Sequence, residues 1–256
     1  MVLPKTSLWV QVQSGLCKGM WMNLCLPQEL RLWRGDHELI VQQAILAAVH
    51  PRAVVFDIGA HVGSIALGLA RLVGPSGHVV AFEADPGNAE SLTENAARNH
   101  LTASLQVVQS AVWSYTATKI CFRCGGTLRS HGGVESDGQS PVIGGGEVIN
   151  VSAVTLDDFL AKGGPVPQLV KIDVEGGEYE VLRGGTNLFS KLRPLIIAEV
   201  HHKSAAEQIG SWLVEHQYLG RWVIPREGFP RCLFARPEEY RGVNWMWKAE
   251  SGSPAD

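Results

Sequence analysis

From residue 53 onward, short apolar runs that suit buried strands alternate with segments whose apolar residues recur at helical spacing. The run 54–58 precedes a helical pattern that places Val62, Ile65 and Leu69 on one face, and a second run follows at 79–83. Strands and helices that alternate in this way form a mostly parallel sheet with helices on both faces. Further strands are predicted at 105–109, 168–174, 194–200 and, in the sequences RWVI and NWMW, near 221–224 and 244–247.

The segments around this pattern indicate an extension, an insertion and a tail. Residues 1–35 contain two β-rich runs separated by glycines, which predicts an N-terminal β-hairpin. Asp36 is a suitable N-cap for the first helix of a domain that we expect to span 36–248. Residues 111–150 are rich in glycine and serine, which predicts an inserted hairpin or loop, and 249–256 is expected to be a disordered tail.

Composition excludes several classes of partner. The chain has 256 residues, a formal net charge of -3 and 18% charged residues, without the basic run that nucleic-acid binding needs. No segment reaches the roughly 20 apolar residues that cross a bilayer. The N-terminus lacks the continuous apolar stretch of a signal peptide. We therefore expect a cytoplasmic protein without nucleic-acid or membrane partners. The five cysteines, including Cys121 and Cys124 in a lone C-x-x-C, are expected to be reduced thiols.

The turn after the first run of the alternating pattern, in VVFDIGAHVGS, is typical of a nucleotide site. Its residues follow the spacing Asp57-x-Gly59-x-x-x-Gly63, whereas a dinucleotide fingerprint would read G-x-G-x-x-G. Asp57 would repel a phosphate but can bind polar or cationic groups. Glu83, at the end of the next run, is placed to accept the hydroxyls of a ribose. These residues look like an S-adenosylmethionine site, although a plain strand-to-helix turn and a helix-capping Glu83 remain as alternatives.

Several longer motifs resemble the FkbM-type methyltransferases between about residues 35 and 200. They are VVFDIGAHVGSIALGLA, HVVAFEADPGNAESLTENAARN, QSAVWS, VTLDDFL, LVKIDVEGGEYEVLRGG and IIAEVH, and RLWRGDHE is similar to an element before the family's first helix. The resemblance implies the Rossmann-like, seven-stranded class I methyltransferase fold. It also implies methylation, usually of oxygen, on a small molecule such as a sugar or a secondary metabolite. His61 stands where the family often has Asn.

The candidate site residues fall into three groups. Residues assigned to the cofactor are Asp57, Gly59, Ala60, Gly63, Glu83 and Ala84, with Ser110 and Ala111 added from the resemblance. Ligands of open α/β sheets bind at the carboxyl ends of the strands, which leaves the remaining acids for chemistry on the acceptor. The candidate catalytic residues are Asp173, Glu199 and His201. The candidate acceptor contacts are Glu175 and Glu178, with Trp33 and Tyr179 added from the resemblance.

In the expected reaction an acceptor oxygen attacks the sulfonium methyl in line with the departing sulfide. Asp173 is the preferred general base or hydrogen-bond acceptor for the nucleophile, and His201 or His202 is the competing base. A purely structural role for Asp173, in a salt bridge with Lys171 or as a loop cap, is the alternative. Acids with a nearby histidine can also hold Mg²⁺ or Mn²⁺, but no fixed ligand spacing is present, and no metal site is predicted.

Two other functions remain open at this point. One is a nicotinamide-dependent oxidoreductase, which lacks its phosphate fingerprint here. The other is a methyltransferase-like domain that binds a nucleoside without turnover. No motif distinguishes a sugar from a polyketide, lipid or peptide acceptor, and none specifies an oligomeric state.

Overall fold

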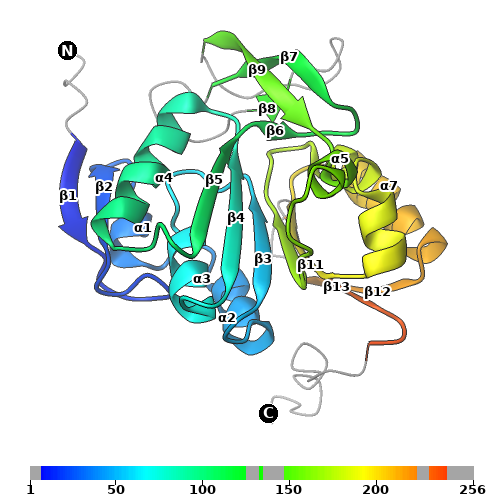
Figure 1. The fold of residues 1–256 in the computed structure, drawn as a ribbon, viewed down its shortest axis with the longest axis horizontal. Helices are drawn as coiled ribbons and strands as arrows, with labels where there is room; N and C mark the ends of the chain where they lie inside the picture. The colour runs from blue at the N-terminus through cyan, green and yellow to red at the C-terminus, as the bar shows by residue number, and fades with distance from the viewer. Residues whose placement is uncertain (1–6, 125–132, 135–146, 224–230, 241–256) are drawn as a thin grey trace, which may run out of the picture.

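The computed structural model describes residues 7–124, 133–134, 147–223 and 231–240. Its largest sheet contains β3 (Val54–Ile58), β4 (His78–Glu83), β5 (Leu105–Gln109), β10 (Leu169–Ile172), β11 (Leu195–Val200), β12 (Tyr218–Val223) and β13 (Arg231–Pro237). The strand order is β12-β13-β11-β10-β3-β4-β5 (Figure 1). Strands β11 through β5 in this order pair in parallel, and β13 pairs antiparallel with both β11 and β12. The predicted seven-stranded, mostly parallel sheet is therefore confirmed.

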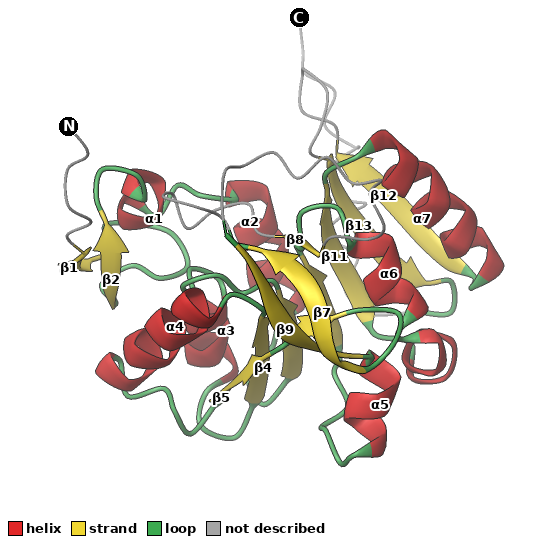
Figure 2. Ribbon diagram, turned by 90° about the horizontal axis from the view of Figure 1, so that it is seen from above, coloured by secondary structure: helices red, strands yellow, loops and turns green. Residues whose placement is uncertain are grey.

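Helices cover both faces of this sheet, as predicted (Figure 2). Successive strand side chains point to opposite faces, so Val55 packs in one core and Phe56 in another. The first core includes α2 (Leu39–Ala48), α3 (Ala66–Val73) and α4 (Pro86–Arg98). The second includes α5 (Leu156–Ala161), α6 (Glu178–Arg183), the π-helical turn Leu188–Leu192 and α7 (Lys203–Glu215). Asp57 and Lys171 are register partners on β3 and β10, and both follow the alternation of the α2 face.

The N-terminal extension forms the predicted hairpin and also a helix that was not predicted. Strands β1 (Ser7–Gln11) and β2 (Trp21–Cys25) pair antiparallel, and α1 (Leu30–Arg34) follows them. The side-chain oxygen of Asn95 accepts from the Asn23 N–H at 2.8 Å, and that of Asn99 accepts from the Trp21 N–H at 2.9 Å. Both asparagines lie in or just after α4, so the hairpin is bound to the main fold. Its buried side chains join the same core as α2, α3 and α4.

The insertion folds as more than the expected hairpin or loop. A four-stranded sheet contains β6 (Ala111–Val112), β7 (Ala117–Arg123), β8 (Gly133–Val134) and β9 (Val148–Val154), in the order β6-β9-β7-β8. It has a small core of its own that includes Trp113 and Phe122. The glycine-rich stretches 125–132 and 135–146 lie outside the described residues. Cys121 and Cys124, predicted as reduced thiols, are both free.

Three local details extend or depart from the predictions. The last strand of the sheet in chain order is Arg231–Pro237, which was not predicted, while NWMW and the tail 249–256 lie outside the described residues. Asp36 does not cap α2, because its carboxylate pairs with Arg31 and Arg34 and the helix begins at Leu39. Among the residues that the structure describes, no helix is long and apolar enough to cross a bilayer.

Candidate active site

The turn after β3 needs glycine at two positions. Gly59 has φ +79°, and a Cβ there would lie 1.7 Å from the carbonyl oxygen of Asp173. Gly63 has φ +98°, and a Cβ there would lie 2.3 Å from a methyl carbon of Leu92. Both positions combine a left-handed backbone with close packing, which only glycine permits. Gly59 therefore lets the turn lie against the start of the loop that follows β10, and Gly63 lets it lie against α4.

Glu83 lies buried at the end of β4 and binds the same turn. One carboxylate oxygen accepts from the His61 N–H at 2.8 Å and the other from the Asp85 N–H at 2.9 Å. Burial raises the pKa of this carboxyl to about 7, against the lowering effect of the two N–H donors. The cap of α4 is Asp85, which accepts from the Gly87 and Asn88 N–H groups. Glu83 is thus held beside the turn and does not cap the helix.

The other residues assigned to the cofactor lie around this turn, and their assignment stays a prediction. Ala60 is buried, and its N–H donates to the Phe82 carbonyl at 3.0 Å. Ala84 packs against the small core of the inserted sheet. Ser110 is buried, and its hydroxyl donates to the carbonyls of Ala111 and Ser152. The Ser110 side chain therefore joins the main sheet to the inserted one.

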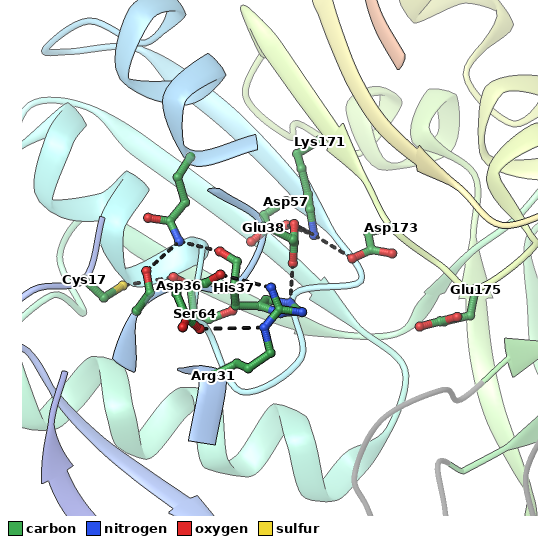
Figure 3. Close-up of polar contacts among 12 residues, drawn as sticks. Cys17, Arg31, Asp36, His37, Glu38, Asp57, Ser64, Lys171, Asp173 and Glu175 are labelled. Carbon is green, nitrogen blue, oxygen red and sulfur yellow. Dashed lines mark hydrogen bonds and ion pairs between the residues drawn. The ribbon is translucent and has the colours of Figure 1, made fainter. Parts of the chain in front are cut away.

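Lys171 lies at the centre of three carboxylates from three different elements (Figure 3). Its Nζ is 3.3 Å from Asp173 Oδ2, 3.5 Å from Asp57 Oδ1 and 3.8 Å from Glu38 Oε2. The Lys171 side chain is 3% exposed, and that of Asp57 is fully buried. Among the described residues, neither Asp57 oxygen has a hydrogen-bond partner. Asp57 is thus a buried acceptor with unused capacity at the end of β3.

In this group of residues, the Lys171 cluster, burial and ion pairing shift the pKa values in opposite directions. Burial raises the pKa of Asp57 to about 6, an effect that Lys171 partly offsets. Burial acts in the same direction on Glu38, but Lys171 and His37 outweigh it and lower its pKa to about 2. Burial disfavours the charged form of Lys171, yet the surrounding carboxylates raise its pKa well above the usual value. Burial also raises the pKa of Asp173, an effect that Lys171 partly offsets. Because Glu38 and Asp57 are both ionised at neutral pH, they alone outnumber the Lys171 ammonium, and the cluster carries more negative than positive charge.

His201 lies just after β11 and connects a second set of acids, the His201 cluster. Its Nδ1 is 2.7 Å from Glu178 Oε1, and its Nε2 is 3.3 Å from Glu175 Oε2 and 3.6 Å from Asp173 Oδ1. Burial opposes protonation of the ring, but the hydrogen bond to Glu178 and the charges of Asp173 and Glu175 raise its pKa to about 9. Asp173 thus belongs to both clusters, through Oδ2 to Lys171 and Oδ1 to His201.

The remaining predicted residues differ in where the structure places them. Glu199 is partly buried on β11, and burial together with Asp173 and Glu38 raises its pKa to about 7. Glu178 is fully buried, and it accepts from the Gly176 N–H at 2.8 Å as well as contacting His201. Trp33 packs against the core of α2, α3 and α4, and Tyr179 packs against the opposite core. Their assignment to the acceptor stays a prediction.

Sequence reasoning did not assign Glu38, His37 or Lys171 to the site. His37 Nε2 lies 2.7 Å from Glu38 Oε1, directly before α2. Glu38 has φ 49°, a conformation that is uncommon outside glycine and that turns the chain into the helix. The signal that could have identified this pair was the element RLWRGDHE. The sequence alone indicates Lys171 only as a structural partner of Asp173.

Comparison with known proteins gives consistent matches. The model of the Methyltransferase FkbM domain matches residues 57–220. The hexuronic acid methyltransferase AglP of Haloferax volcanii is 28% identical over 180 residues, which are 67% of this chain and 65% of that protein. The 31-O-demethyl-FK506 methyltransferase FkbM of Streptomyces tacrolimicus is 31% identical over 183 residues, 62% of this chain and 69% of that protein. The chain thus spans about two thirds of the length of each relative.

A solved structure shares the fold. The crystal structure of methyltransferase FkbM from Methylobacillus flagellatus superposes with a TM-score of 0.51 at 18% identity, covering 72% of this chain and 43% of that one. At this identity the match supports the arrangement of strands and helices alone. It agrees with the predicted class I methyltransferase architecture.

Proposed function

Because the chain belongs to the FkbM methyltransferase family, we propose that it transfers a methyl group from S-adenosylmethionine to a hydroxyl oxygen of a small molecule, such as a sugar or a secondary metabolite. The observation that carries the proposal is the juxtaposition of two sets of carboxylates at one edge of the parallel sheet. One set, Asp57 and Glu83, adjoins the glycine turn, and the other surrounds Asp173. Open α/β sheets bind their ligands at this edge.

The residues beside the turn fit a cationic nucleoside. Asp57 has two buried oxygens without hydrogen-bond partners among the described residues, and these suit a ligand that brings donors or positive charge. Glu83 is held by two backbone N–H groups and retains lone pairs for the hydroxyls of a ribose. The net negative charge of the Lys171 cluster favours a sulfonium compound over a diphosphate. When bound, S-adenosylmethionine supplies the methyl group and the sulfide leaving group.

Asp173 is the residue of this chain that would receive or hold the proton of the acceptor hydroxyl. Lys171 binds one of its oxygens, so the other, Oδ1, faces the His201 cluster. The principal contribution to rate is expected from alignment, since well-oriented reactants can gain about 7–11 kcal/mol. A positioned base contributes a further factor of about 10²–10⁴.

Replacing Asp173 with Asn tests this assignment. Asp173→Asn removes the charge but preserves the shape, so S-adenosylmethionine should bind with little change while turnover at saturation falls by about tenfold or more. Binding is measured by calorimetry, and turnover by formation of S-adenosylhomocysteine with a fractionated metabolite extract as acceptor. Glu180→Gln, which alters an exposed ion pair on α6, is the matched control. Weakened cofactor binding with normal turnover at saturation would refute the role of Asp173.

A further inference from the structure

The His201 cluster offers three donor atoms that converge on one point. His201 Nε2, Asp173 Oδ1 and Glu175 Oε2 all lie within 4.8 Å of one another. They come from the end of β10, the loop after it and the residue after β11, so the sheet topology brings them together. Imidazole nitrogen and carboxylate oxygen are common ligands of divalent transition metals.

The distances fit ligands of a shared ion better than a hydrogen-bonded pair. Nε2 is 3.3 Å from Glu175 Oε2 and 3.6 Å from Asp173 Oδ1, both longer than a good N–H···O bond. Two ligands that each lie about 2.1 Å from a tetrahedral ion are about 3.4 Å apart. The two separations from Nε2 bracket this value.

Glu178, which contacts the other ring nitrogen of His201, also supports a metal ion at Nε2. Its Oε1 lies 2.7 Å from His201 Nδ1, which fixes the ring so that Nε2 faces Asp173 and Glu175. Carboxylates that bind the second ring nitrogen orient metal-ligating histidines in this way. Glu178 is fully buried, and its Oε2 has no hydrogen-bond partner within the described part of the chain. A divalent ion on Nε2, which would replace the proton that His201 binds there, would offset the cost of that buried negative charge.

A second group of donors, on Glu38, Asp173 and Glu199, is less suitable. Its oxygens also lie within 4.8 Å of one another. However, the Lys171 ammonium already pairs with Glu38 and with Asp173. A divalent ion there would meet a fixed positive charge a few ångströms away, so the His201 cluster is the better site.

We infer that Asp173, Glu175 and His201 form a binding site for a divalent transition metal ion such as Mn²⁺ or Zn²⁺. The site lies at the carboxyl ends of β10 and β11, where no metal site was predicted from the sequence. Its use rests on the proposed function: an ion held by Asp173 would bind the acceptor hydroxyl and lower the pKa of that hydroxyl. With the ion bound, Asp173 would act on the hydroxyl as a ligand of the ion, and the hydroxyl proton would leave to solvent. The binding site itself can be tested without an acceptor.

Titration of the metal-free chain with Mn²⁺, followed by the electron paramagnetic resonance signal of the free ion, tests the inference. We expect one saturable Mn²⁺ site per chain, from which Zn²⁺ displaces the bound Mn²⁺. Glu175→Gln and His201→Ala should each weaken it by about tenfold or more. Glu180→Gln is the control for loss of one carboxylate nearby. Thermal unfolding of each variant verifies that it is folded, and Glu175→Gln, whose side chain is 31% exposed, should fold normally.

Absence of saturable Mn²⁺ and Zn²⁺ binding, or binding that Glu175→Gln leaves unchanged, would overturn the inference. S-adenosylmethionine is titrated into the same metal-free preparation. Cofactor binding without metal binding would remove the metal site and leave the proposed function standing. Metal binding without cofactor binding would support the metal site and contradict the proposed function.

Discussion

The Lys171 cluster and the His201 cluster share Asp173 but are built differently. The first is closed: Lys171 is 3% exposed, and Asp57 beside it is fully buried. The second is open on one side, because Glu175 is 31% exposed while Glu178 beneath it is buried. The buried, ion-paired Lys171 cluster suits a single cofactor, whereas the partly exposed His201 cluster can receive different acceptors. The difference implies that stability depends mainly on the first cluster and acceptor chemistry on the second.

Removing the Lys171 charge is the strongest test of this contrast. Lys171→Met would leave Glu38, Asp57 and Asp173 without their cation, and we expect a loss of about 3–5 kcal/mol in the free energy of unfolding. Glu175→Gln, at the open cluster, should change it by less than about 1 kcal/mol. Both are measured by urea unfolding. Equal losses in the two variants would show that the clusters do not differ as described.

Adding a methyl group at Gly59 tests how tightly the turn is packed. Gly59→Ala places a Cβ 1.7 Å from the Asp173 carbonyl, whereas Gly19→Ala places one at a similar φ of +78° with nothing within 4 Å. Both variants carry backbone strain of about 1–3 kcal/mol. The Gly59 variant should lose a further 1–3 kcal/mol or so from the clash. Similar unfolding midpoints for the two variants would contradict the close approach of the turn to β10.

The raised pKa of Glu83 predicts a smaller effect, on pH dependence. A ribose hydroxyl needs the ionised carboxylate, and its pKa is about 7, so affinity for S-adenosylmethionine should improve about threefold to fivefold from pH 6.5 to 8. The stability of the fold responds with the opposite sign. Because the pKa of Glu83 is raised in the folded state from the ordinary 4.5, its protonation contributes stability that is fully present below pH 4.5. This contribution is lost as the pH rises through about 7. Calorimetry across this range should give a flatter profile for Glu83→Gln. An unchanged profile in that variant would assign the titration to another group.

The sequence predicted the main sheet well because its buried strands are continuous apolar runs. The last strand was missed because RCLFARP has only Leu233, Phe234 and Ala235 as a fully buried apolar stretch between polar ends. The aromatic sequence NWMW had stronger local β-propensity. Pairing with β11 and β12 determines where the last strand forms, and a single sequence does not reveal such pairing.

Sequence reasoning could select candidate residues at strand ends, whose roles stay predictions, but it could not anticipate contacts between distant segments. Asp57, Glu83 and Asp173 were identified because each follows or ends an apolar run. Glu38 was missed because the local capping signal favoured Asp36. In the fold, Arg31 and Arg34 bind Asp36, and the next turn directs Glu38 toward Lys171. These ion pairs are tertiary, so helix-start rules do not predict them.

The most direct test of the account is calorimetric titration of S-adenosylmethionine into the wild-type chain and into Glu83→Gln. We expect one saturable site per chain, with affinity about tenfold or more weaker in the variant through loss of the charged hydrogen-bond acceptor. Titration with NAD should give no comparable binding. Absence of saturable heat with millimolar S-adenosylmethionine, or equal affinity in both proteins, would contradict the central claim that these carboxylates bind the methyl donor.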